Sequence, residues 1–358
     1  MPATPFLRAS PNPVPIGCDP GTTTINWSAG HEEAEVYVTR DGEQEKPFAQ
    51  GSHGSQDAPW INRGSTYQFR LYGRGPRITP LATVTVRPCE ATAPIWEPGC
   101  VSFYCNICGQ ACLKKLEELE RESRSCAGCG STVRWRSVIH ALSIELFGES
   151  IPLSDFPVMP EITGIGMSDW NGYAIPLAQK FSYQNTYYHQ DPKLDITAID
   201  PALEGKFDFI ISSDVFEHIA PPVSAAFENV RKLLKPNGAL VFTVPYWKHD
   251  RTVEHFPELC DYKILEKNGN YVLMNTTRNG VVQVFDELVF HEGPGSTLEM
   301  RMFSELSLIE EFKKAGFNNV KIHREPAFDY GIYWKYDFAF PMSARVSQTK
   351  SLLGTRRL

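Results

Sequence analysis

The sequence lacks the features that would mark a membrane, secreted or nucleic-acid-binding protein. It has no run of eighteen apolar residues for a membrane-spanning helix, and its proline-broken start, MPATPFLRASPNPVP, has no apolar segment typical of a secretion signal. The net charge is −7, and no basic stripe occurs beyond Arg356 and Arg357, which disfavours a phosphate-backbone partner. We therefore expect a cytoplasmic protein with neither membrane nor nucleic acid as a partner.

The composition is that of a folded protein with more than one domain. The chain has 358 residues, of which 42% are apolar and 22% charged, and this length usually exceeds what one hydrophobic core serves. Changes in pattern along the chain divide it into five parts. We expect a β-sandwich at 1–90, a linker at 91–100, a zinc-ribbon segment at 101–135, an α/β domain at 136–345 and a tail at 346–358.

The first ninety residues are rich in short β-branched and aromatic runs, such as TTTINWS, EAEVYVTRD and LATVTV, separated by turn residues. Trp27 and the alternating Tyr67, Phe69 and Leu71 are the predicted inner face of a small sandwich. The pattern resembles an immunoglobulin or fibronectin type III-like module without the Cys-Trp-Cys hallmark. Trp60 is interpreted as a packing residue, with carbohydrate or protein binding as the alternative.

Two CxxC pairs predict a metal site. Cys105 and Cys108 are separated by seventeen residues from Cys126 and Cys129, which is a spacing typical of a four-thiolate zinc site. Since all four ligands are protein sulfurs, the metal is expected to be structural. The alternatives are four unrelated thiols, or a ligand set that includes Cys112. The charged segment LKKLEELERESRS, residues 113–125, is predicted to be a helix.

From about residue 135 the chain alternates helices with apolar strands. Predicted helices lie in RWRSVIHALSIELFG, NGYAIPLAQKF and PPVSAAFENVRKLLKPNG, and predicted strands lie in EITGIG, SYQNTYYH, FDFIIS and ALVFTVP. This rhythm indicates an α/β fold with a Rossmann-like, doubly wound, mostly parallel sheet. Ligands bind such sheets at the carboxyl ends of the strands.

The segments FDFIISSDVFEHI and LLKPNGALVFTVPY resemble class I S-adenosylmethionine-dependent methyltransferases over about residues 135–325, and the paired cysteine segments look like the zinc knuckles of some members. The family's first loop usually has an acid and three glycines, which are replaced here by Ile162 and the Gly-x-Gly-x-Ser of GIGMSDW. The residue that meets the ribose is left open among His189, Gln190 and Asp191. The resemblance implies S-adenosylmethionine as cofactor and these contacts: Gly164, Gly166, Ser168, Asp169, Asp191, Asp195, Ser213 and Asp214.

The expected reaction is in-line methyl transfer to a small molecule or a sugar or glycan acceptor, with O-methylation preferred because histidines that can serve as general bases follow the motif strands. The catalytic candidates are His218, His249, His255 and His291. A substrate lid is expected at about 247–303. Glu299 and Arg301 within it are expected to pair structurally, with contact to a polar acceptor as the alternative. The oligomeric state is left open.

The spacing D-x-x-E-H in Asp214, Glu217 and His218 resembles the cluster with which certain O-methyltransferases hold a divalent ion. The alternative is that these residues only order the loop beside the cofactor. Two other functions are kept open. One is a zinc-containing binding or scaffold protein without activity, and the other is a protein or RNA methyltransferase.

Overall fold

A computed structural model describes residues 5–10, 12, 14, 20–30, 33–62, 64–88, 99–291 and 297–346. The chain divides into two compact units, and the cysteine-bearing segment is shared between them. The first unit is Met1–Tyr104 with Gly109–Lys115, and the second is Cys105–Cys108 with Leu116–Leu358. Most of the predicted linker at 91–100 and nearly all of the tail at 346–358 lie outside the described residues.

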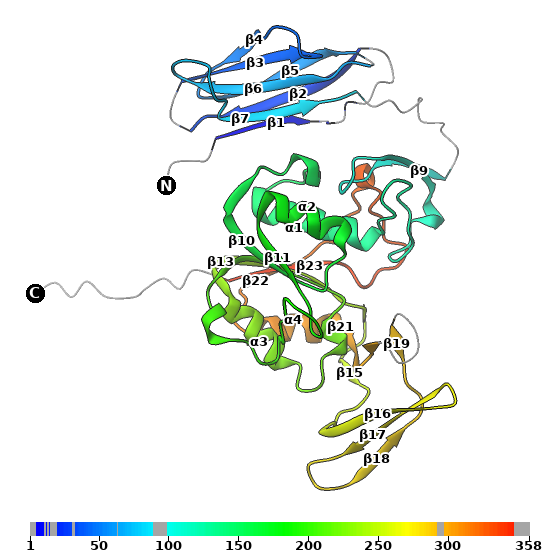
Figure 1. The fold of residues 1–358 in the computed structure, drawn as a ribbon. Helices are drawn as coiled ribbons and strands as arrows, with labels where there is room; N and C mark the ends of the chain where they lie inside the picture. The colour runs from blue at the N-terminus through cyan, green and yellow to red at the C-terminus, as the bar shows by residue number, and fades with distance from the viewer. Residues whose placement is uncertain are drawn as a thin grey trace, which may run out of the picture. The chain divides into compact units, whose positions relative to one another are not determined.

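The first unit contains two antiparallel sheets that share one hydrophobic core (Figure 1). Trp27, Tyr67, Phe69 and Leu71 are buried in that core, as the alternation predicts. Trp60 packs on its edge, with its ring stacked on Phe69. The strands are β1 (Phe6–Ser10), β2 (Gly21–Ser28), β3 (Ala34–Arg40), β4 (Lys46–Gln50), β5 (His53–Ile61), β6 (Tyr67–Gly73) and β7 (Ala82–Val86).

The predicted helix at 113–125 is wrong. Its first residues belong to β9 (Ala111–Lys115), which pairs with β8 (Cys100–Tyr104), and only a short 3-10 turn, Leu116–Glu118, follows. These charged residues have a high helix propensity, but a helix made of them would have no apolar face to bury. Most of the stability of a helix in a protein comes from burying such a face. The segment between the cysteine pairs is therefore mainly a loop.

The second unit contains a six-stranded sheet in the order β11-β10-β12-β13-β23-β22. The first four strands are parallel, and β23 is antiparallel to both of its neighbours, so the expected mostly parallel sheet is observed. The strands are β10 (Met159–Met167), β11 (Phe181–Thr186), β12 (Phe207–Ser213), β13 (Leu234–Thr243), β22 (Asn319–Ile322) and β23 (Met342–Arg345).

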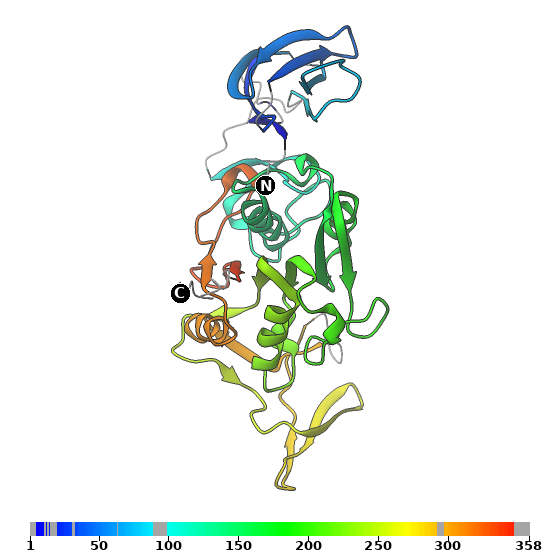
Figure 2. The same ribbon diagram turned by 90° about the vertical axis from the view of Figure 1, so that its left-hand side faces the viewer.

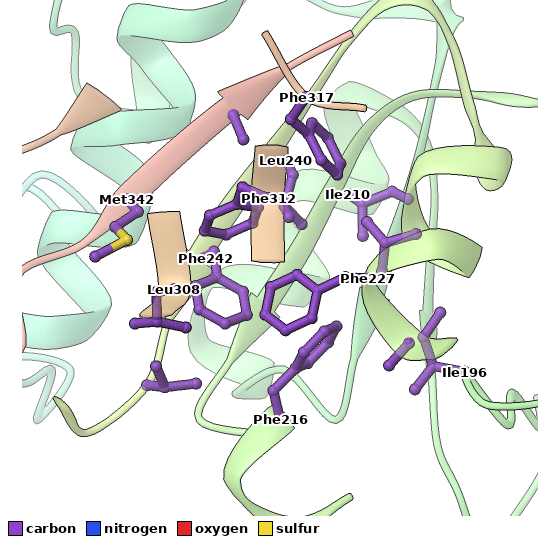
Figure 3. Close-up of a cluster of buried hydrophobic side chains, with 14 of the residues drawn as sticks. Ile196, Ile210, Phe216, Phe227, Leu240, Phe242, Leu308, Phe312, Phe317 and Met342 are labelled. Atoms are coloured by element: carbon purple, nitrogen blue, oxygen red, sulfur yellow. The ribbon is translucent and has the colours of Figure 1, made fainter. Parts of the chain in front are cut away.

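Helices cover both faces of this sheet, with α1 and α2 on one face and α3 and α4 on the other (Figure 1). Figure 3 shows the core on the second face, where Phe227 and Phe312 pack edge-to-face and contact Phe242 of β13. Three of the helices agree with prediction, but α3 ends at Leu233 because Leu234–Gly238 already belong to β13. The helices are α1 (Val133–Phe147), α2 (Asn171–Lys180), α3 (Ser224–Leu233) and α4 (Glu305–Lys314).

The predicted lid, residues 247–303, folds into small, mostly antiparallel sheets, and one of them projects beyond the six-stranded sheet (Figures 1 and 2). Within the described part of the chain, no helix is long and apolar enough to cross a membrane. The insert strands and their neighbours are β14 (Tyr246–Trp247), β15 (Val253–Glu254), β16 (Asp261–Lys267), β17 (Asn270–Thr276), β18 (Val282–Phe285), β19 (Phe290–His291), β20 (Thr297–Leu298) and β21 (Arg301–Ser304).

Candidate functional site

The carboxyl ends of β10 and β12 lie side by side at the point where the order of the strands along the chain reverses. The chain leaves β10 towards β11 on one side, whereas it leaves β12 towards β13 on the other. Ser168 and Asp214, the residues just beyond the two strands, both have left-handed backbone conformations, with φ of 56° and 55°. Open α/β sheets bind ligands in the crevice that forms at such a switch point.

The glycines of the predicted first loop lie inside β10 rather than in a loop. A Cβ on Gly164 would lie 2.1 Å from Phe209 Cζ, and a Cβ on Gly166 would lie 2.0 Å from Tyr183 Oη and 2.1 Å from Asp169 Oδ2. Both glycines are therefore required by internal packing. The loop itself consists of Ser168–Trp170, which follow β10.

Asp169 is buried under this loop and makes hydrogen bonds inside the protein. Its Oδ1 accepts from Tyr173 Oη at 2.7 Å, its Oδ2 accepts from Tyr183 Oη, and its N–H donates to Asn185 Oδ1 at 2.9 Å. Burial raises the pKa of Asp169 to about 7, although the two tyrosine hydrogen bonds act in the opposite direction. Its side chain thus supports the first loop from below.

The residues predicted to bind the ribose, 189–191, do not lie at the end of β11. β11 ends at Thr186, so Asp191 does not end the strand, and it is exposed together with His189 and Gln190. Asp195 forms a local turn, in which its Oδ1 accepts from the N–H and the hydroxyl of Thr197 at 2.9 and 2.7 Å.

Asp214 is the centre of an ion-pair network at the end of β12. Arg121 donates to both carboxylate oxygens at 2.8 and 2.7 Å, Arg134 Nε lies 3.1 Å from Oδ2, and Thr243 Oγ1 donates to Oδ1 at 2.9 Å. Arg134 also donates to Ser213 Oγ at 2.7 Å. Burial alone raises the pKa of Asp214, but the two guanidinium charges outweigh it and hold this pKa below its usual range.

The four predicted cysteines come together in the second unit. Their sulfur atoms all lie within 4.8 Å of one another, with Cys105 3.7 Å from Cys129 and Cys108 3.6 Å from Cys126. Hydrogen bonds from Cys105 and Cys108 lower the pKa of Cys129 to about 3. The cluster can hold a metal ion, and Arg121 belongs to the loop between the two cysteine pairs.

Three of the four predicted histidines form one cluster around Glu299. His291 Nε2 lies 3.0 Å from Glu299 Oε2, His255 Nε2 lies 2.9 Å from Glu299 Oε1, and His218 Nε2 lies 3.1 Å from His291 Nδ1. Burial lowers the pKa of His218, whereas the hydrogen bond to Glu299 raises that of His291. His249 is exposed and lies outside this cluster.

Glu217 faces the same cluster, and Asp214 does not. The Glu217 side chain is fully buried, and neither carboxylate oxygen has a hydrogen-bond partner. Burial raises the pKa of Glu217 well above its usual range, and the charge of Asp214 raises it further. The expected metal ligands Asp214, Glu217 and His218 are therefore not brought together, because both carboxylate oxygens of Asp214 are bound by arginines. Glu217 and His218 instead lie close to His291.

Sequence analysis missed Arg121, Arg134 and Tyr183, and it favoured a structural role for Glu299 over contact with a polar acceptor. Arg121 and Arg134 lie 93 and 80 residues before Asp214 in the sequence, and no motif marks such a contact. Glu299 and Arg301 each have a partner in the insert, since Arg301 Nε donates to Glu254 Oε1 at 2.7 Å.

Comparisons with known proteins agree with this architecture. A model of the methyltransferase domain family matches residues 128–322, whereas no curated protein matches significantly. An N1-methyltransferase for 1,6-didemethyltoxoflavin from Burkholderia thailandensis, solved with S-adenosylhomocysteine, is 16% identical over 52% of this chain and 71% of its own, with a TM-score of 0.29. An S-adenosylmethionine-bound amino pentose methyltransferase from Micromonospora echinaspora is 13% identical over 52% and 84%, with a TM-score of 0.30.

A third structure, an S-adenosylmethionine-dependent methyltransferase from Mesorhizobium loti, is 12% identical over 61% of this chain and all of its own, with a TM-score of 0.30. These values are too low to assign an acceptor. The family match, however, spans more than half of the chain. The chain therefore belongs to the methyltransferase domain family and is an S-adenosylmethionine-dependent methyltransferase.

The Asp169→Asn substitution is expected to remove a pH dependence of stability. Folding raises the pKa of Asp169 from 3.8 to about 7, so the folded state keeps a proton that the unfolded state loses in this window. Wild-type stability should therefore fall, relative to the variant, as the pH rises from about 4 to about 7, by at most about 4 kcal/mol. Urea unfolding at several pH values measures this difference.

Asp261→Asn, which changes an exposed carboxylate, is the matched control and should follow the wild-type profile. Parallel profiles for wild type and Asp169→Asn would show that the buried carboxyl group has no raised pKa.

Proposed function

We propose that the protein transfers the methyl group of S-adenosylmethionine to a hydroxyl group of a small molecule, sugar or glycan. The observation that carries this proposal is the position of the histidine cluster. The seven residues from Ser212 to His218 lead from the strand end at the switch point directly to His218 and its partners. A cofactor crevice and a group of potential proton acceptors are thus joined by one short turn.

The donors at the crevice suit this cofactor, which supplies an activated methyl group on a sulfonium when bound. The amino-acid part of S-adenosylmethionine carries a carboxylate, for which a guanidinium fork is a favoured partner. Arg134 offers such a fork, and the half-exposed Glu122 carboxylate now occupies it at 2.8 Å with both oxygens. We propose that Arg134, Ser213 and the Ser168 backbone hold the cofactor, while Asp214 positions the two arginines.

The acceptor is proposed to bind in a cavity of about 290 Å³ formed by the insert. His255 and Glu299 line this cavity, together with Phe256, Phe285 and two further carboxylates, Asp286 and Glu287. Three carboxylates disfavour an anionic acceptor, and aromatic rings beside polar groups suit a neutral hydroxylated one. His255 is the histidine that reaches the cavity, and we propose that it accepts the hydroxyl proton.

Cofactor binding is tested by isothermal titration with S-adenosylhomocysteine. We expect wild type to bind and Arg134→Gln to bind at least tenfold more weakly, because a charge-assisted hydrogen bond to a carboxylate is lost. Arg124→Gln, which changes an exposed arginine of the cysteine loop, should bind like wild type. Equal affinities for all three proteins would contradict the assignment of Arg134.

The reaction itself is tested with isotope-labelled S-adenosylmethionine and a panel of neutral sugars and hydroxylated small molecules. The label should appear in a methyl ether, which NMR separates from N-methyl and C-methyl products. Label on nitrogen or carbon would overturn O-methylation, and label on added protein or RNA would favour the other class of methyltransferase.

We further propose that the four cysteines hold a structural zinc ion. A tetrahedral ion with Zn–S bonds of 2.3 Å separates its sulfurs by about 3.8 Å, close to the 3.6 and 3.7 Å between the paired sulfurs. Such an ion would fix the loop that brings Arg121 to Asp214. Zinc would then support the cofactor crevice without taking part in chemistry.

Cys126→Ser is expected to lose about one equivalent of zinc per chain and to lower S-adenosylhomocysteine affinity at least tenfold, because the loop that holds Arg121 is released. Elemental analysis and calorimetry measure the two effects. Cys260→Ser, which changes an exposed cysteine outside the cluster, is the control. Full zinc content in Cys126→Ser would contradict the four-thiolate site.

We also propose that residues 1–90 form an immunoglobulin or fibronectin type III-like auxiliary module, supported by two sheets of three and four strands around one core. The cytoplasmic location stays a prediction from the sequence.

A further inference from the structure

Three potential metal ligands converge beside the cofactor crevice. Glu217 Oε1 lies 3.7 Å from His218 Nε2 and 4.0 Å from His291 Nδ1, and the two ring nitrogens lie 3.1 Å apart. Glu217 is fully buried, and neither of its carboxylate oxygens has a hydrogen-bond partner. A buried carboxyl group whose oxygens have no hydrogen-bond partner is costly, so a group that binds these oxygens is expected here.

Outer hydrogen bonds decide which ring nitrogens face the cluster with a lone pair. His218 Nδ1 lies 2.9 Å from the Leu298 carbonyl oxygen, which only accepts, so Nδ1 carries the proton and Nε2 the lone pair of the neutral ring. His291 Nε2 faces the Glu299 carboxylate at 3.0 Å, so the neutral ring has its lone pair on Nδ1. The two lone pairs therefore face one another next to a carboxylate, an arrangement that a cation between them stabilises.

The spacing of the three atoms fits a metal ion. A triangle with sides of 3.1, 3.7 and 4.0 Å has its centre about 2.1 Å from each corner, and metal–nitrogen and metal–oxygen bonds of zinc are 2.0–2.2 Å. The bonds from His218 to a carbonyl and from His291 to a carboxylate are the outer contacts that usually orient metal-binding histidines.

We propose that Glu217, His218 and His291 bind one divalent first-row transition-metal ion, such as Mn²⁺, Co²⁺ or Zn²⁺. Two imidazoles disfavour Mg²⁺ and Ca²⁺, which prefer oxygen ligands only. The site differs from the four-cysteine cluster in its residues and in its ligand type. Three protein ligands leave coordination positions open.

The role of this ion rests on the proposed function. The ion would bind the acceptor hydroxyl and lower its pKa, and the proton would pass to His255, which shares Glu299 with His291. The oxygen lone pair then forms the bond to the methyl carbon while the carbon–sulfur bond breaks and its electrons return to sulfur. The products are a methyl ether, S-adenosylhomocysteine and one proton.

Binding is tested by adding Mn²⁺ to full-length protein that holds one zinc ion per chain, in the cysteine cluster, and following free Mn²⁺ by electron paramagnetic resonance. Mn²⁺ is a hard ion that favours carboxylate and imidazole over thiolate, so the cysteine cluster does not compete. We expect about one Mn²⁺ per chain. Glu217→Gln and His291→Gln should each weaken binding at least tenfold, whereas His53→Gln, an exposed histidine of the first unit, should not.

The two proposals fail in different ways. No saturable Mn²⁺ binding by wild type, or unchanged binding by Glu217→Gln, would overturn the metal site. If S-adenosylhomocysteine still binds in that case, the proposed methyl transfer stands without the ion. Because wild type alone decides the first outcome, a variant that fails to fold leaves the test intact.

Discussion

The buried carboxylate of Asp214 and the two arginines that neutralise it organise the functional edge of the sheet. A charged carboxylate in this position is tolerated only because Arg121 and Arg134 surround it, and removing one partner of such a group commonly costs 3–5 kcal/mol. The network joins the cysteine loop, the first turn of α1 and the ends of β12 and β13. The first two of these elements are far apart in the sequence from the last two, yet one carboxylate and its hydrogen bonds connect them.

The turn after β12 separates two environments within four residues. The guanidinium groups beside Asp214 lower the pKa of its carboxyl group, whereas burial, together with the charge of Asp214, raises the pKa of Glu217. Two carboxylates of the same turn therefore have opposite charge preferences. We assign the first to the cofactor crevice and the second to the acceptor side, where the insert contributes His255, His291 and Glu299.

Apolar periodicity and turn signals in the sequence predicted the helices and strands that depend on local interactions. The strand β12 and the helices α1, α2 and α3 appear in the segments where the sequence places them, although α3 ends at Leu233, before the predicted Pro-Asn-Gly end signal. The prediction of a helix at 113–125 was wrong because the charged residues of this segment have helix propensity but form no apolar face that could be buried. CxxC spacing predicted the cysteine cluster because four soft ligands at that spacing have few other uses.

For the candidate site, single residues were predicted, but the contacts between them were not. Three of the histidines were named, but their common partner Glu299 depends on how the insert folds back, which no local pattern shows. Gly166 was expected to approach a ligand, whereas it makes room for the Tyr183–Asp169 pair. Asp214 was expected to touch the cofactor, whereas its carboxylate is bound by Arg121 and Arg134, which lie 93 and 80 residues before it in the sequence.

A double-mutant cycle on Arg121 and Asp214 tests most directly whether this ion pair organises the crevice. S-adenosylhomocysteine affinity is measured for wild type, Arg121→Gln, Asp214→Asn and the double variant. We predict that each single change weakens binding and that the double change costs clearly less than their sum, by at least about 1 kcal/mol, because the partners depend on each other. Additive effects, or affinities equal to wild type, would contradict the account.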